Sequence, residues 1–476
     1  MTRRTIVRTG VRLAVGVVAL AVGAGVVAAA TALPIPRLED RPAARVVTPV
    51  ALDQQRVCEG SLLRLSGDTG ASATSLSAVG STATVTGAGS GDRAVRTPLT
   101  GADGSPSSPL LVTAPADGTR IPLVAGSQSQ DVQESDLSGF AAAPCQEPTN
   151  STWLVGGSTQ TGRTTLISLV NPTDVNSTVD LSVWAENGAV QGPGLQGIVV
   201  APRSQKVVPL SGFATDLASP VVHVTSRGGQ IVSSLQVSVV RTLQAGGADL
   251  VSASAAPARR VTVPGVVVRD TDRVAAAAGQ DGFADLAPVV RVFVPGEANA
   301  QLSIQLSTTS GTGATFTVSA EGGQVTDLPL DDLAAADYTA TIDSNVPVVA
   351  GVRTSSVATD SSTDLAWTGG APALSGTTMF TAATGPAGLL TVTNPTNRAI
   401  EATYRLAAGP GYRAVTTKLA VPANASVSSP LRARGVYTLS SADGLRAAVS
   451  YEESGAIAAY PLFSPTAVSS PVTVYP

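Results

Sequence analysis

Short apolar runs separated by turn residues recur along most of this 476-residue chain. Within residues 221–225, alternation places Val222 and Val224 on one face of an extended segment and His223 on the other. Gly and Pro punctuate the runs, and the helix-favouring residues Lys, Glu and Gln are sparse. The pattern predicts an all-β protein of short antiparallel strands joined by frequent turns.

One β-rich pattern occurs three times, over residues 152–250, 266–365 and 378–462. In the first and third copies an apolar run leads into Asn171-Pro172-Thr173 and Asn394-Pro395-Thr396, whereas the second copy has Pro295-Gly296-Glu297 at this place. A repeat of about 100 residues is too long for a solenoid unit and matches a whole domain.

We therefore predict tandem immunoglobulin-like β-sandwich domains, with roughly seven to nine strands each, after an N-terminal transmembrane helix or signal segment. The turns at residues 226–229, 343–345 and 441–444 suit tight hairpins. Residues 60–140 form either a fourth, degenerate sandwich or an irregular cap. The expected boundaries are 1–40 for the basic flank and helix, 41–148 for a disulfide-stapled β-rich region, and 149–258, 259–370 and 371–476 for the three repeats.

The N-terminal segment predicts export. Four arginines within the first twelve positions precede an uncharged run over residues 13–33. Such a run, at about 1.5 Å per residue, is long enough for a helix that spans a bilayer, and the basic flank would stay in the cytoplasm. We expect either a single-pass membrane protein with an extracytoplasmic C-terminal part, or a secreted protein cleaved after Ala30 or Ala32.

Two cysteines, Cys58 and Cys145, bracket the segment before the repeats. In an oxidising compartment they predict one disulfide that stabilises a stretch with few large apolar residues. Two unrelated thiols are the alternative, and a metal site is disfavoured because two thiols and one distant histidine do not make a ligand set.

The search for catalytic chemistry finds no candidate residue. His223 is the single histidine and lies between valines, so we interpret it as a strand residue and not as a general base. No Gly-x-Ser-x-Gly elbow and no glycine-rich phosphate-binding motif is present, so we expect no catalytic residue and no cofactor. Asp270 and Asp272 could ligate calcium, although a solvated turn between domains is the simpler interpretation.

The net charge and the aromatic residues limit the kinds of partner that we expect. The net charge of −4 becomes −8 without the four N-terminal arginines, which disfavours nucleic acid. Trp153 and Trp367 fall at expected domain junctions. Tyrosines gather in the last copy, where they are either core and corner residues or a partner surface. The candidate surface comprises Tyr404, Tyr412, Tyr437, Tyr451 and Tyr460.

Three stretches carry a family resemblance. They are the run from Cys145 to Trp153 and the glycines after it, the Leu-Val-Asn171-Pro-Thr-Asp turn, and the strand that follows from Val179 to Gly188. From about residue 40 onward the chain resembles an actinobacterial family of uncharacterised, membrane-anchored or secreted envelope proteins, a domain-of-unknown-function family. The resemblance implies an extracytoplasmic protein often encoded beside an envelope glycosyltransferase, and implies no activity, cofactor or catalytic residue.

Two hypotheses follow. The first is a non-enzymatic cell-envelope protein, a tandem β-sandwich scaffold or partner-binding ectodomain, whose partner is an envelope protein or cell-wall glycan and which meets the membrane through its N-terminal helix. The alternative is an envelope carbohydrate-binding or carbohydrate-processing protein. A concave groove with Trp or Tyr and converging acids would favour the alternative.

Overall fold

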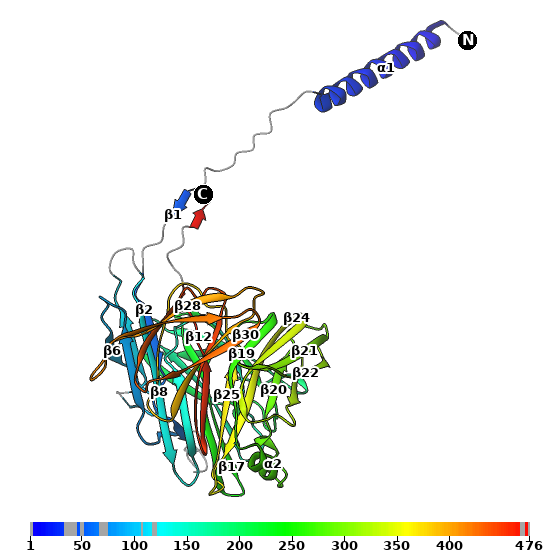
Figure 1. Cartoon of the computed structure of the whole chain (residues 1–476). Helices are drawn as coiled ribbons and strands as arrows, with labels where there is room; N and C mark the ends of the chain where they lie inside the picture. The colour runs from blue at the N-terminus through cyan, green and yellow to red at the C-terminus, as the bar shows by residue number, and fades with distance from the viewer. Residues whose placement is uncertain are drawn as a thin grey trace. The chain divides into compact units, whose positions relative to one another are not determined.

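The computed structural model describes residues 3–32, 45–47, 52–65, 75–105, 108–116, 121–466 and 472–474. It is mostly β, with 55% strand and 7% helix, arranged in many small antiparallel sheets. The chain divides into one unit of residues 1–49 and 469–476, and a second unit of residues 50–468 (Figure 1).

The first unit contains helix α1 (Arg3–Ala32) and a two-stranded pairing of β1 (Arg45–Val47) with β34 (Val472–Val474). The side chains described in α1, those of residues 14–29, are exposed and largely apolar. Within the described part of the chain, no helix is both long enough and apolar enough to cross a membrane. The end of the predicted apolar run at Leu33 and the predicted domain boundary at residue 40 lie outside the described residues.

In the second unit, the third copy has the simplest strand set. Its two sheets are ordered β26-β31-β28-β29 and β30-β27-β32-β33. If these strands are numbered one to eight along the chain, the orders read 1-6-3-4 and 5-2-7-8. The strands are β26 (Thr378–Thr381), β27 (Ala387–Asn394), β28 (Ile400–Leu406), β29 (Val415–Val421), β30 (Ala425–Leu431), β31 (Val436–Ser440), β32 (Arg446–Glu453) and β33 (Ala456–Pro461).

The first copy repeats this order, with sheets β10-β16-β12-β13 and β15-β11-β17-β18, and β14 also pairs with β12. Its strands are β10 (Ser151–Val155), β11 (Arg163–Asn171), β12 (Ser177–Ala185), β13 (Gly188–Ala189), β14 (Ile198–Val200), β15 (Ser204–Pro209), β16 (Val221–Gly228), β17 (Val232–Arg241) and β18 (Gln244–Val251). A 3₁₀ turn, η2 (Leu210–Gly212), follows β15.

The second copy has the same order, but a single long strand serves both of its sheets. The first part of β24 pairs with β19 and β21, and its last part pairs with β20 and β25. The elements are β19 (Ala258–Val268), α2 (Thr271–Ala278), η3 (Ala284–Leu286), β20 (Val289–Phe293), β21 (Ala300–Thr308), β22 (Gly311–Ala320), β23 (Val325–Pro329), β24 (Ala336–Val357) and β25 (Thr363–Gly369). The copies thus have nine, seven and eight strands, as the sequence predicted.

The region before the repeats keeps part of the same order. Its sheets β2-β7-β6 and β5-β8-β9 correspond to 1-6-3 and 2-7-8, without counterparts of strands four and five among the described residues, and β3 pairs with β4 separately. Of the two expectations for this region, a degenerate fourth copy accounts for the strand order. The strands are β2 (Gln54–Cys58), β3 (Leu63–Leu65), β4 (Leu76–Ala78), β5 (Ala83–Ala88), β6 (Val95–Pro98), β7 (Leu110–Ala114), β8 (Val124–Gln133) and β9 (Ser138–Pro144).

The predicted hairpins at residues 226–229, 343–345 and 441–444 are wrong. The strands before and after these turns belong to different sheets, since β16 pairs with β10 and β12 whereas β17 pairs with β11 and β18. In the second copy β24 runs through the expected turn. The chain crosses between two facing sheets at these points, and a crossing needs no tight reversal.

Each copy encloses one apolar core drawn from both of its sheets. In the third copy, Ala402 and Leu439 of one sheet share a cluster with Val392 and Val449 of the other. The first and second copies have equivalent clusters. This shared core explains the alternation along the strands, because one face of each strand is buried against the opposite sheet.

The last strand of each copy lies at the centre of the second unit. β9 packs on β18, β18 on β25, β25 on β33, and β33 on β9, which closes a ring that we call the central strands. β25 lies in the middle of the view in Figure 1. The ring joins the region before the repeats and the three copies into one body.

Candidate functional site

A cavity of about 640 Å³ lies where the chain leaves the central strands. Segments that follow each of the four strands line it: residues 145–149 after β9, 253–256 after β18, Pro372 after β25, and 462–464 after β33. The size falls within the range of about 300–1,000 Å³ that is usual for small-molecule sites. No single copy could form this cavity, because all four segments contribute to it.

The first strands of the region before the repeats, of the first copy and of the third copy also line the cavity. β2 contributes residues 54–56, β10 contributes residues 151–153, and β26 contributes residues 379–381. Each of these strands is the edge of its sheet. The outer side of an edge strand carries backbone N–H and C=O groups that are not paired within the sheet, and these groups need other hydrogen-bond partners.

The segments after the central strands satisfy two of these edges. Val57 and Gln146 exchange two backbone hydrogen bonds, of 2.8 and 2.9 Å. In the first copy, the Ser254 N–H donates to the Trp153 carbonyl at 2.8 Å. These contacts hold the cavity wall to the segments that line its floor.

Charged groups in the lining are paired. Arg56 forms an ion pair with Glu147 at 2.6 Å, and Glu147 also accepts from the Thr466 N–H at 3.2 Å. Asp53 accepts from the Ala116 N–H at 2.8 Å. Among the described residues these three are the charged residues of the lining, and Arg56, the one cation of the three, is paired.

Two buried polar atoms in the lining lack partners. Gln54 is 4% exposed and Ser233 is 1% exposed. Within the part of the chain that the structure describes, neither Gln54 Oε1 nor Ser233 Oγ has a hydrogen-bond partner. An unsatisfied buried polar group costs about 1–3 kcal/mol, so native proteins seldom retain one without a reason.

Ser151, which lines the cavity, contacts the single histidine. Its Oγ lies 2.8 Å from His223 Nε2, and the imidazole stacks on Trp153 with ring centroids 4.1 Å apart. Burial lowers the pKa of His223, which favours the neutral ring. His223 lies in β16, as its interpretation as a strand residue requires, and no described carboxylate bonds its other nitrogen. The pair therefore lacks the third group that orients the imidazole in catalytic triads.

The opposite end of the central strands is closed around Asp364. This carboxylate is 0% exposed and accepts from the backbone N–H groups of Phe140 at 3.0 Å, Ile457 at 3.0 Å and Ala248 at 3.2 Å. One side chain thus ties β25 to the other three central strands. A Cβ at Gly139 would come 2.5 Å from Asp364 Oδ1, so the approach requires glycine there.

Burial also affects two other acids near the centre. It raises the pKa of Glu59 to about 7, although hydrogen bonds from Ser234 and Gln146 act to lower this pKa. It also raises the pKa of Asp249 to about 7, although backbone hydrogen bonds from Trp367 and Leu250 act to lower this pKa. These groups stabilise the body most when they are protonated.

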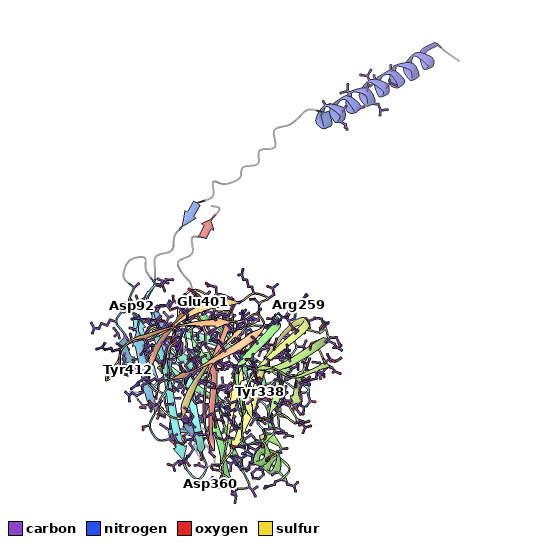
Figure 2. All side chains as sticks on the ribbon, in the orientation of Figure 1. Asp92, Arg259, Tyr338, Asp360, Glu401 and Tyr412 are labelled. Atoms are coloured by element: carbon purple, nitrogen blue, oxygen red, sulfur yellow. A yellow bond between two sulfur atoms is a disulfide. The ribbon has the colours of Figure 1, made fainter. Side chains whose placement is uncertain are left out.

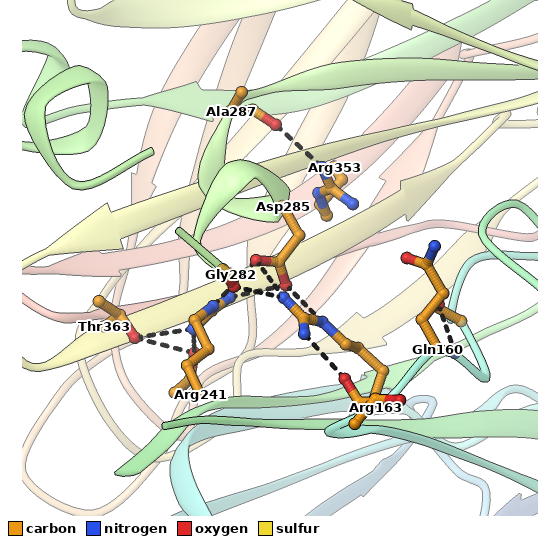
Figure 3. A network of polar contacts seen from close by, with 11 residues as sticks. Gln160, Arg163, Arg241, Gly282, Asp285, Ala287, Arg353 and Thr363 are labelled. Atoms are coloured by element: carbon orange, nitrogen blue, oxygen red, sulfur yellow. Dashed lines mark hydrogen bonds and ion pairs between the residues drawn. The ribbon is translucent and has the colours of Figure 1, made fainter. Parts of the chain in front are cut away.

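A network of arginines and aspartates joins the first and second copies. Figure 3 shows Arg163 and Arg241 of the first copy converging on Asp285 of the second, with Nη2–Oδ distances of 2.9 Å each. Burial opposes ionisation of Asp285, but the two arginines hold its pKa below the usual value. Arg291 pairs with Asp327 at 2.8 Å and stacks over Trp367 at 4.4 Å. These charges are satisfied within the network, which indicates a structural role.

Trp367 itself belongs to β25 of the second copy but packs in the core of the first. Trp153 packs beside Val155 and against Phe293 of the second copy. Both tryptophans therefore lie at junctions between copies, as predicted.

The predicted disulfide is present. Cys58 and Cys145 are bonded to each other and link β2 to the segment after β9. Cys145 lines the cavity, so the crosslink also fixes part of the cavity wall.

The tyrosine surface needs correction. Tyr404, Tyr437, Tyr451 and Tyr460 are buried in the core of the third copy, and Tyr437 stacks on Tyr404 with centroids 5.2 Å apart. Their hydroxyls are used internally, as in the 3.1 Å contact between those of Tyr451 and Tyr460. Their rings pack within the core, and Tyr460 also lines the cavity. Tyr412 alone is partly exposed, lies at the periphery in Figure 2 and packs under Arg432.

Asp270 and Asp272, for which calcium binding was the less favoured possibility, lie at the start of a helix. Asp270 directly precedes α2 and pairs with Arg273 and Ser356, and Asp272 lies in the first turn of that helix. They do not form the solvated turn that the sequence favoured. Among the residues the structure describes, no group of three or more His, Cys, Asp or Glu side chains could hold a metal ion.

The repeated Asn-Pro-Thr turn has a structural explanation. Asn171 is buried, donates from Nδ2 to the carbonyls of Val175 and Val200, and accepts from Thr173 N–H and Oγ1. Asn394 makes the equivalent four hydrogen bonds in the third copy. The motif therefore closes a turn and does not mark a ligand site.

Sequence reasoning missed the cavity and Asp364. The segment after each central strand contains a proline, namely Pro148, Pro257, Pro372 and Pro465, but a proline indicates a turn and not a cavity. Asp364 has no signal in the sequence either, since its partners come from three distant strands.

The comparisons with known proteins give a family and no activity. No curated protein matches the chain. The model of a family described as a family of unknown function, DUF5719, matches residues 99–432, which is more than half of the 476 residues. The chain therefore belongs to the DUF5719 family.

Proposed function

We propose that this protein is a non-enzymatic, partner-binding ectodomain of the cell envelope, built from tandem immunoglobulin-like β-sandwiches. The observation that carries the proposal is the cavity, which four segments of the chain form together. An array whose last strands converge on one cavity gains a site that no isolated sandwich has.

Export is part of this proposal, with the N-terminal helix either retained in the cell membrane or cleaved. The Cys58–Cys145 disulfide supports it, because disulfides persist mainly in oxidising compartments outside the cytoplasm. The resemblance to an actinobacterial envelope family makes an envelope glycosyltransferase, or its polymer product, a candidate partner.

The test is capture of an envelope component by the full chain in detergent, from solubilised membranes and from purified cell-wall glycan. Ala255 lines the cavity and is partly exposed, so Ala255→Trp should fill the space and abolish capture. Ala298→Trp, at an exposed position of the second copy, should leave capture unchanged. Capture that survives Ala255→Trp, or no capture at all, would contradict the proposal.

A carbohydrate-processing enzyme is the second candidate, and the contact between Ser151 and His223 is the observation that favours it. An activated serine reacts with a fluorophosphonate probe. We expect no labelling of Ser151 in the full chain. Labelling that disappears in His223→Ala would favour the enzyme over the binding protein.

A further inference from the structure

The cavity has the polar chemistry of a site for a neutral ligand. Gln54 Oε1 needs a hydrogen-bond donor, and Ser233 Oγ can donate or accept. Both atoms have less than 1 Å² of exposed surface, so the side chains of Gln54 and Ser233 must rotate before a ligand in the cavity can bond them. A hydroxyl group both donates and accepts, and it is therefore the simplest group that serves both atoms.

The remaining lining points the same way. Further neutral amides and hydroxyls line the cavity, and its charged groups already have partners. An ionic ligand would have to compete with the ion pair of Arg56 and Glu147, whereas a neutral ligand would leave it intact. The apolar side chains Leu52 and Phe463, 60% and 39% exposed, also line the cavity and could cover the C–H face of a sugar ring.

The edge strands disfavour a peptide. A peptide that adds to a sheet needs a free backbone edge. Val57 of β2 already exchanges hydrogen bonds with Gln146, and the Trp153 carbonyl of β10 already accepts from Ser254. These contacts occupy one position on β2 and one on β10 at which an added strand would pair.

We propose that the cavity binds a neutral oligosaccharide, with sugar hydroxyls bonded to Gln54 and Ser233. This inference rests on the proposed function as a binding ectodomain and specifies its ligand. Leu52 and Thr466, which lie close in sequence to the two ends of the second unit, both line the cavity.

The probe is an array of immobilised neutral oligosaccharides, each printed beside an acidic counterpart, together with a set of uncharged peptides. The full chain should be retained by at least one neutral sugar and by neither of the other classes. In titrations with the retained sugar, Gln54→Met and Ser233→Ala should each weaken binding roughly three- to tenfold, as expected for the loss of one neutral hydrogen bond. Gln301→Met, an exposed glutamine of β21, should bind like the wild type.

Retention by acidic sugars or peptides alone, retention by no sugar, or unchanged affinity in both cavity variants would overturn the oligosaccharide assignment. Thermal unfolding of each variant checks that it is folded. If Ala255→Trp blocks capture of an envelope component while no neutral sugar binds, the ligand class is wrong and the binding function stands. If nothing is captured, both proposals fail.

Discussion

The two ends of the central strands differ in how their polar groups are satisfied. At one end, both oxygens of Asp364 accept backbone hydrogen bonds from three other strands. At the other end, Gln54 and Ser233 line a cavity, and Gln54 Oε1 and Ser233 Oγ lack hydrogen-bond partners within the described chain. The polar groups at the first end stabilise the fold. At the second end, two buried polar atoms without partners destabilise it, and a bound ligand that supplies hydrogen bonds would offset that loss.

The largest expected effect is at the closed end. Asp364→Ala leaves three buried N–H groups without an acceptor and should lower the free energy of unfolding by about 3–5 kcal/mol. Urea denaturation of the full chain measures this. Asp281→Ala, which removes an exposed acid of the second copy, is the control and should leave the midpoint unchanged. Equal midpoints for both variants would remove the contrast between the two ends.

The disulfide is the main covalent constraint at the cavity end. Replacing both Cys58 and Cys145 by serine should lower stability by about 2–5 kcal/mol, because the unfolded region before the repeats gains conformational freedom. Calorimetry of the double variant, compared with the wild type with and without reductant, measures the loss. A wild type that reductant does not destabilise would mean that the cavity wall does not depend on the crosslink.

The buried acids predict a pH dependence with a definite sign. The ordinary pKa values of Glu59 and Asp249 are 4.5 and 3.8, and burial raises both to about 7 in the folded protein. Their stabilisation is complete below the ordinary values and is lost as the pH rises toward 7, at up to about 1.4 kcal/mol per pH unit for each group. The Tm should therefore be higher at pH 5 than at pH 8.

Glu59→Gln keeps the shape of the side chain and removes its titration, so the Tm of this variant should fall less between pH 5 and pH 8. Asp285 has a lowered pKa and loses its contribution only as the pH falls through that value, outside this window. A Tm that rises from pH 5 to pH 8 would contradict the burial of these acids.

The smallest effect is expected at Gln54. Since its Oε1 has no partner, Gln54→Met removes no hydrogen bond from that atom and relieves the cost of the unpaired acceptor, so it should raise the free energy of unfolding by about 1 kcal/mol. Gln236→Met is the matched comparison, because Gln236 bonds both backbone groups of Leu63, at 2.7 and 2.6 Å, and should be clearly destabilised. Equal destabilisation of both variants would show that Gln54 is satisfied in solution.

The sequence predicted what depends on neighbours along the chain. Alternation and turn residues gave the β class and the repeat, and the cysteines gave the disulfide. The Asn-Pro-Thr turn recurs in the sequence as a short motif. A short motif is enough to specify it, because all four hydrogen bonds of Asn171 are local or reach the next strands.

The cavity and the central ring could not be predicted in this way. Phe140 and Asp364, which meet in the ring, are 224 positions apart, and neither residue type at its position requires the other. The tyrosines also show that the sequence alone does not predict tertiary packing. Their enrichment is visible in the sequence, but only packing decides that Tyr437 and Tyr451 face the core and not a partner.

The most direct test of the difference between the two ends is the side-chain amide signal of Gln54 in the full chain with labelled glutamine, during titration with the neutral oligosaccharide that the array retains. We expect a saturable shift of the Gln54 signal, while the signal of Gln128, whose Oε1 already accepts from the Gly60 N–H at 3.0 Å, stays in place. A bound sugar that leaves the Gln54 signal unmoved, or that shifts both signals equally, would contradict the assignment of the cavity as the binding site.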